Sequence, residues 1–176
     1  MSGHNKWSQI KRQKGAADAA KGVAFGKLAK RIAVESKAAK GDVSSPTLRA
    51  IIEKARELNM PKDKISAAVA KGISTDSGDL EAVTYESYGP GGAAIVIDAL
   101  TDNRNRTVQE IKHILSKNGL ILASAGSAAW AFEKTHEGFE AKTHVPLSEA
   151  DSDALMKIMD ELDNQDDVEA VYTNAE

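Results

Sequence analysis

Lysine and arginine side chains gather in the first forty residues of the chain, and they are the groups best able to bind a ligand. Residues 1–40 hold ten Lys and Arg but only two acids, Asp18 and Glu35. Cations at this density suit the phosphates of a nucleic acid, because each neutralised phosphate releases bound counterions. The alternative is a solvated helix face with a basic tail. The candidate contacts are His4, Lys6, Trp7, Lys11, Arg12, Lys14, Lys27, Lys30 and Arg31.

Trp7 has two candidate roles within the basic arm, residues 1–15. Its indole ring can stack on a nucleobase, or it can anchor the arm to the folded domain, which is the commoner use of a lone Trp. Aromatic residues make up only 5% of the chain. An extensive base-stacking platform is therefore excluded.

A second candidate anion site lies in the middle of the chain, at Arg104 and Arg106. The capping-box pattern that starts at Thr107 predicts a helix directly after these two arginines. A helix N-terminus attracts anions through its free N–H groups and the positive end of its dipole. The alternative is that both arginines pair with nearby acids such as Asp98 and Asp102. The sequence alone favours neither role.

Patterns of catalytic and metal-binding residues are missing from the sequence. The chain has no cysteine and its four histidines are dispersed, which argues against a zinc site and excludes a cysteine nucleophile. No Walker, Gly-x-Ser-x-Gly or His-Glu-x-x-His motif occurs. The Gly-Pro-Gly-Gly stretch at 89–92 leads into a strand, which predicts a type II hairpin turn instead of a phosphate loop. We therefore expect no catalytic residue, no metal and no cofactor.

Charge divides the chain into two unlike parts. Residues 1–72 hold 16 Lys and Arg against 6 Asp and Glu, a balance of +10, whereas residues 73–176 hold 7 against 20, a balance of −13. The acids of the second part gather at 160–169, where they could attract a basic protein or a metal, with a solvated helix end as the alternative.

No apolar run approaches the roughly 20 residues of a membrane span. The N-terminus lacks the apolar stretch of a secretory signal, so we expect a cytoplasmic protein.

Periodicity predicts a three-helix bundle followed by a different kind of domain. Residues 16–39 repeat apolar side chains at Phe25, Leu28, Ala29 and Ile32, which is the spacing of one buried helical face. Two more helices follow, at 46–59 and 61–72, each opened by a proline. The turn-rich stretch 73–80 predicts a linker. We therefore assign residues 1–72 to the arm and bundle and residues 81–176 to a second domain.

The second domain alternates between strand and helix patterns. Helices are expected after Thr107 and after Ser148, where cap patterns precede apolar residues at helical spacing. The order of elements predicts an α+β fold in which the helices pack on a mostly antiparallel, ferredoxin-like sheet. The strands are expected at 82–88, 93–100, 120–124, 127–134, 141–147 and 168–173.

The chain contains four distinctive blocks of sequence, GHNKWSQIK at 3–11, YESYGPGG at 85–92, DNRNRT at 102–107 and DDVEAVYTN at 166–174. Together these blocks resemble the YebC/PmpR family. Members are usually labelled probable transcriptional regulators, and their mitochondrial relatives are translational activators. The resemblance implies a three-helix N-terminal domain and a ferredoxin-like second domain. Typical members also carry a third domain inserted into the second, which this chain lacks between 133 and 142.

Together these observations predict a cytoplasmic, non-enzymatic regulator of gene expression that binds DNA through its basic N-terminal domain. The alternative is a translation factor that binds RNA or the ribosome, because the first helix offers mainly Lys and Ala rather than base-reading side chains. An enzyme acting on a phosphorylated ligand at Arg104 and Arg106, and an adaptor whose acidic half binds a basic protein, are more distant alternatives. No membrane partner is expected, and the sequence does not indicate an oligomeric state.

Overall fold

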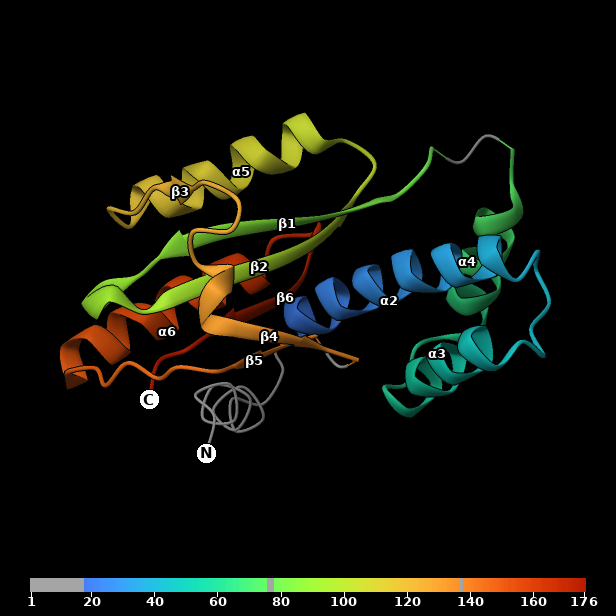
Figure 1. The fold of residues 1–176 in the computed structure, drawn as a ribbon. Helices are drawn as coiled ribbons and strands as arrows, with labels where there is room; N and C mark the ends of the chain where they lie inside the picture. The colour runs from blue at the N-terminus through green and yellow to red at the C-terminus, as the bar shows by residue number, and fades with distance from the viewer. Residues whose placement is uncertain (1–17, 76–77, 137) are drawn as a thin grey trace. The chain divides into compact units, whose positions relative to one another are not determined.

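The chain folds into two compact units. The computed structural model describes residues 18–75, 78–136 and 138–176. The helical unit lies within Ala17–Glu81, and the sheet unit runs from Ala82 to Glu176 (Figure 1). The combination of helices with an antiparallel sheet confirms the predicted α+β fold class.

The helical unit is built from three helices around one small core. Apolar side chains from all three helices meet in this core, including Ile32, Leu48, Ile52 and Ile65. Phe25, Leu28 and Ala29 pack against its margin, so the apolar face predicted for the first helix is confirmed. The helices are α2 (Asp18–Ala38), α3 (Pro46–Glu57) and α4 (Lys62–Ile73).

Helices α2 and α4 approach each other closely at Gly72. The Ser36 hydroxyl is buried and donates to the carbonyl of Val69, 2.8 Å away. A Cβ atom added at Gly72 would lie 2.3 Å from the Ala33 carbonyl oxygen and 2.7 Å from the Ser36 Cβ. A side chain at position 72 therefore cannot be accommodated unless the two helices move apart.

Replacing Gly72 with alanine is expected to destabilise the helical unit by about 1–3 kcal/mol, which is the usual cost of overpacking. The clash is with the backbone of α2, so rotation of a side chain cannot relieve it. Urea unfolding of the full chain, followed by circular dichroism, measures the change. Gly22→Ala in α2 is the matched control, because a Cβ there meets nothing within 4 Å. We expect that control to gain about 0.5–1 kcal/mol, and a Gly72→Ala protein as stable as Gly22→Ala would contradict the close approach.

The sheet unit contains a four-stranded sheet in the order β3-β1-β2-β6. The β1–β3 and β2–β6 pairs are antiparallel, and strands β4 and β5 form a separate hairpin (Figure 1). The strands are β1 (Glu81–Tyr88), β2 (Ala94–Thr101), β3 (Leu122–Ala123), β4 (Phe132–Thr135), β5 (Gly138–Ala141) and β6 (Val168–Thr173). The helices are α5 (Arg104–Lys117) and α6 (Glu149–Asp163).

Alternation along β2 gives the sheet one core on each face. Ile95 and Ile97 pack with apolar residues of α5 and α6, whereas Ala94 and Val96 pack with the β4–β5 hairpin around Phe132. Side chains at successive strand positions point to opposite faces, so the run of apolar residues in β2 reflects burial on both sides. The sheet thus has a helix-covered face and a hairpin-covered face.

The loop between β1 and β2 is a turn, as predicted. Gly91 has φ +67 and ψ 8, and the Gly92 N–H donates to the Gly89 carbonyl at 3.1 Å. Glycine adopts this left-handed conformation without strain. The 89–92 stretch therefore joins two strands and does not lead into a helix.

Three predicted strands differ from the structure. Residues 127–134 begin instead as the short 3-10 helix η2 (Ala129–Ala131) before β4, and 120–124 is reduced to the two residues of β3. Residues 142–147 form no strand, although Val145 makes one isolated bridge to Ala175. The physical reason at 126–129 is the Glu86 carboxylate, which accepts three backbone N–H groups that a strand would need for its ladder.

Candidate nucleic-acid interface

The cations of α2 share the side of the helix that faces away from the core. Lys27, Lys30 and Arg31 stand at i, i+3 and i+4, a spacing that places them on one face. Phe25 and Ile32, on the other side, pack into the helical core. Arg31 is exposed, whereas Lys27 and Lys30 are half-buried. The structure thus brings three of the predicted phosphate contacts together on one helical surface.

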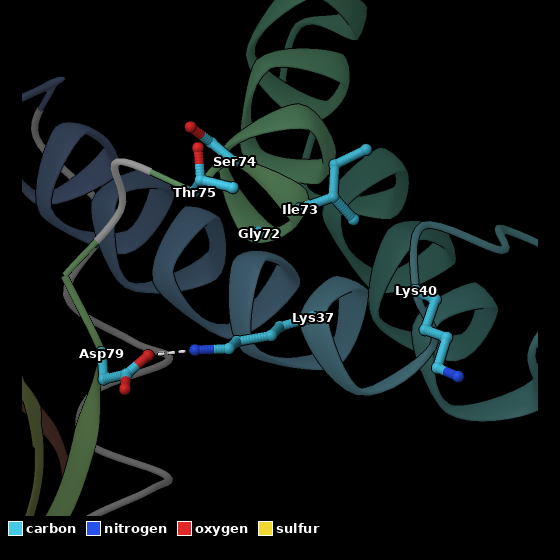
Figure 2. Close-up of a pocket in the computed structure, with 7 residues that line it drawn as sticks. All are labelled: Lys37, Lys40, Gly72, Ile73, Ser74, Thr75 and Asp79. Carbon is cyan, nitrogen blue, oxygen red and sulfur yellow. Dashed lines mark hydrogen bonds and ion pairs between the residues drawn. The ribbon is translucent and has the colours of Figure 1, made fainter.

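Two further lysines lie at the C-terminal end of α2, beside an open pocket of the helical unit. Lys37 and Lys40 line this pocket together with residues 72–75 and Asp79 (Figure 2). The Lys37 amino group forms an ion pair with Asp79. The hydrogen bond and charge of Lys37 lower the pKa of the Asp79 carboxyl below its usual value. Both side chains are largely exposed, so the pair contributes little stability, and a competing anion can reach Lys37.

The rest of the helical unit adds to the positive charge. Residues 18–75 contain 12 Lys and Arg against 6 Asp and Glu. Some of these charges are paired on their own helix, as Arg49 is with Glu53 at 3.0 Å on α3. The unit therefore keeps a surplus of positive charge, which attracts polyanions over a distance of about a Debye length.

The predicted contacts of the basic arm lie outside the described residues, so their role stays a prediction. They are His4, Lys6, Trp7, Lys11, Arg12 and Lys14.

The structure corrects the predicted start of the helix near Arg104 and Arg106. Helix α5 begins at Arg104 instead of after Thr107, and its N-cap is Asn103, whose side chain accepts from the Arg106 N–H at 3.1 Å. Asn and Asp are favoured caps because their side chains satisfy the free N–H groups of the first turn. Both arginines consequently lie within the first turn of α5 and not ahead of it. The N–H of Arg106 is already bound by the cap.

The Arg106 side chain is tied to two carboxylates of the sheet unit. One guanidinium nitrogen lies 2.8 Å from Asp102 and 2.9 Å from Asp167. The Asp167 hydrogen bond, followed by that of Asp102, raises the pKa of Arg106 above its usual value. The side chain of Asp167 is only 2% exposed. For Arg106 the structure thus favours the alternative of local pairing.

Asp167 is the centre of a buried polar cluster that the sequence did not reveal. The Thr107 hydroxyl lies 2.7 Å from Asp167 Oδ2 and 2.8 Å from Thr101 Oγ1. The backbone N–H of Asn103 donates to Thr101 Oγ1 at 2.9 Å. These contacts join the end of β2, the first turn of α5 and the residue before β6. Asp167 is 60 residues from Thr107, so no local pattern pairs them.

Glu86 is a second buried acid that was not predicted. Its carboxylate accepts from the backbone N–H groups of Gly126 at 2.6 Å, Ala128 at 2.7 Å and Ala129 at 2.8 Å. Burial alone would raise the pKa of Glu86, but these hydrogen bonds outweigh burial and lower it below its usual value of 4.5. The charged carboxylate therefore holds the 126–129 loop against β1.

Stability is expected to depend on pH through Glu86. Because the folded pKa is lowered, its contribution is complete above the unfolded pKa of 4.5 and is lost as pH falls through the folded pKa. Glu86→Gln is expected to cost roughly 1.5–3 kcal/mol at pH 7, the range for hydrogen bonds to a charged group. The difference in unfolding free energy between the parent chain and Glu86→Gln should shrink when urea unfolding is repeated at pH values down to 3. Glu133→Gln, on the exposed surface of β4, is the control and should not change this slope, and a pH-independent deficit in Glu86→Gln would rule out the charged clamp.

The described part of the chain shows neither a metal-binding cluster nor a membrane span. No group of three or more His, Asp or Glu side chains there is arranged to hold a metal ion. Similarly, none of the described helices has the length and apolar character needed to cross a membrane.

Models of one protein family match most of the chain. Residues 5–75 match the TACO1/YebC protein N-terminal domain. Residues 80–139 match the TACO1/YebC second and third domain. The boundary between the two matches falls in the stretch that joins α4 to β1.

Curated relatives carry the name "Probable transcriptional regulatory protein". The protein of Fervidobacterium nodosum is 52% identical over 136 residues, which cover 76% of this chain and 54% of that protein. The protein of Desulfosudis oleivorans is 46% identical over 172 residues, 94% of this chain and 66% of that protein. The protein of Dictyoglomus turgidum is 44% identical over 179 residues, which cover 100% of this chain and 72% of that protein. The chain thus spans between about half and three quarters of the length of these relatives.

A solved structure shares the fold. The crystal structure of a conserved hypothetical protein from Aquifex aeolicus superposes with a TM-score of 0.83 at 26% sequence identity, covering 93% of each chain. The similarity extends over both units.

Proposed function

The chain belongs to the TACO1/YebC family, and on that premise we propose that it is a non-enzymatic, cytoplasmic regulator of gene expression that binds nucleic acid through its helical unit. The name shared by its relatives supports regulation of transcription, with DNA as the leading partner. The proposal needs no cofactor and assigns no catalytic residue.

The observation that carries this proposal is the cationic face of α2. Lys27, Lys30 and Arg31 lie together on the side opposite the core, and Lys37 and Lys40 continue the positive charge to the end of the helix. Lysine and arginine on a rigid helix contact phosphates without needing a particular base sequence. The basic arm would extend this contact. The helical unit is thus suited to follow a phosphate backbone.

RNA, or the ribosome, is the second candidate partner, and the composition of α2 favours it. The helix contains no Asn or Gln, the side chains that most often read adenine in the major groove. Its only arginine is Arg31, which leaves a single side chain suited to reading guanine. Binding through the backbone alone suits a partner recognised by shape, which is the usual way in which proteins recognise RNA helices.

Two measurements on the full chain test the proposal. The affinity of the chain for a duplex DNA and for an RNA hairpin of equal length is measured between 50 and 200 mM salt. For a protein that binds phosphates, the logarithm of the binding constant must fall linearly with the logarithm of the salt concentration. Cell lysate is then fractionated on a sucrose gradient, with and without ribonuclease. Ribonuclease-sensitive migration with ribosomes supports the RNA partner, and ribonuclease-insensitive migration with binding to promoter DNA supports DNA. Failure to bind either nucleic acid at 50 mM salt would refute the proposal.

A further inference from the structure

Beyond nucleic-acid binding, we propose that the sheet unit carries a second binding surface, formed by Tyr88, Ile121 and Trp130, and that its ligand is an arginine-containing segment of a basic protein. We call these three residues the aromatic patch. The sheet unit is acidic, so its partner must differ in chemistry from the partner of the helical unit.

The aromatic patch contains the large apolar side chains that the described part of the sheet unit leaves exposed. Trp130 is 58% exposed, Ile121 81% and Tyr88 38%. Trp130 Nε1 donates to Tyr88 Oη at 2.9 Å. In the β1–β3 pair, Ser87 lies opposite Leu122, and the Ser87 hydroxyl donates to the Ile121 carbonyl at 2.9 Å, so Ile121 lies beside the end of β1 that carries Tyr88. The three exposed residues therefore lie close together at this end of the sheet.

The aromatic patch is held in place by its own polar groups. Tyr88 Oη donates to the Ser127 carbonyl, and the only polar group of the Trp130 ring is used on Tyr88. The loop that leads into Trp130 is bound by the Glu86 carboxylate through three backbone N–H groups. A ligand therefore meets fixed ring faces, and little conformational entropy is lost when it binds.

Charge decides what the aromatic patch binds. An aromatic ring face is negative and attracts cations, and residues 82–176 carry 17 Asp and Glu against 7 Lys and Arg, a balance of −10. This field repels the phosphates of a nucleic acid and attracts a basic segment.

Arginine fits the patch better than lysine. The planar guanidinium stacks on an aromatic ring and is more weakly hydrated than an ammonium group. Its plane can cover the exposed ring of Trp130. A segment with arginine should therefore bind more tightly than one with the same charge supplied by lysine.

The test uses the full chain with Trp7→Phe, which leaves Trp130 as the only tryptophan. Nona-arginine and nona-lysine peptides, matched in length and charge, are titrated at 0.1 M salt, with fluorescence of Trp130 and calorimetry as readouts. We expect nona-arginine to change the Trp130 fluorescence and to bind roughly twofold more tightly than nona-lysine, because both cations are attracted to the ring but only the planar guanidinium stacks on it. A single-stranded oligonucleotide is titrated in parallel.

Two variants locate the effect. Trp130→Leu should abolish the preference for arginine in calorimetry, whereas Trp130→Phe, which keeps a ring, should retain most of it. Urea unfolding checks that both variants are folded, as expected for an exposed side chain. Any one of three results would overturn the proposal. The two peptides could bind with equal affinity, the preference for arginine could survive Trp130→Leu, or the Trp130 fluorescence could respond to the oligonucleotide alone. Loss of nucleic-acid binding by the helical unit would leave these results unchanged, so the two proposals fail separately.

Discussion

Replacing Lys27, Lys30 and Arg31 with glutamine is expected to lower the affinity of the chain for nucleic acid by about 10²-fold at 0.1 M salt and to flatten its salt dependence. Each phosphate contact contributes about 0.9 to the log–log slope on duplex DNA and about 0.7 on a single strand. The slope should therefore fall by roughly 2.7 on a duplex if all three side chains reach a phosphate. Fluorescence anisotropy of labelled DNA and RNA over a salt series measures both quantities.

A matched substitution on α3 separates a binding face from net charge. Replacing Arg49, Lys54 and Arg56 with glutamine removes the same three charges from the same unit, and all three residues are exposed. Arg49 is also paired with Glu53, so its charge is partly neutralised within the helix. We expect this variant to bind only a few fold more weakly, with a nearly unchanged slope. Equal losses in the two variants would show that only the overall charge matters and that α2 is not the interface.

Local sequence patterns predicted the helical unit closely. The expected helices at 16–39, 46–59 and 61–72 correspond to α2, α3 and α4 within two residues at each end, because each is defined by its own apolar spacing and a nearby proline or glycine. The cationic face of α2 follows from the same spacing, since the core-facing side chains fix where the others point. The contacts of the basic arm stay a prediction.

Predictions failed where a distant side chain decides the local structure. The Thr107-to-Glu110 cap pattern placed the start of α5 four residues late, because the Thr107 hydroxyl is used on Asp167 and the cap is Asn103. The strand expected at 127–134 is interrupted by Glu86, which lies 40 or more residues earlier in the chain. Hydrophobic periodicity contains no information about either carboxylate. Both acids look like ordinary surface residues until the fold buries them.

Replacing Asp167 with alanine is expected to destabilise the sheet unit by about 1.5–3 kcal/mol, the range for hydrogen bonds to a charged group. The Thr107 hydroxyl loses its closest acceptor but keeps Thr101 Oγ1 at 2.8 Å and the Asn103 carbonyl at 3.1 Å. Arg106, which is 44% exposed, regains contact with water. Urea unfolding of the full chain measures the loss. Urea unfolding of an Arg106 variant likewise addresses the role of Arg106, for which the sequence alone left anion binding and local pairing open.

Arg106→Gln should destabilise the sheet unit, because the 2%-exposed carboxylate of Asp167 is then left in the interior without its cation. Its nucleic-acid salt slope should remain that of the parent chain, since the guanidinium is already bound by two carboxylates. Arg104→Gln is the matched control, because Arg104 lies on the same turn of α5 and is exposed, and a surface substitution of this kind usually changes stability by less than about 0.5 kcal/mol. A flattened salt slope in Arg106→Gln with unchanged stability would instead identify Arg106 as a phosphate contact, and would move part of the nucleic-acid interface onto the sheet unit.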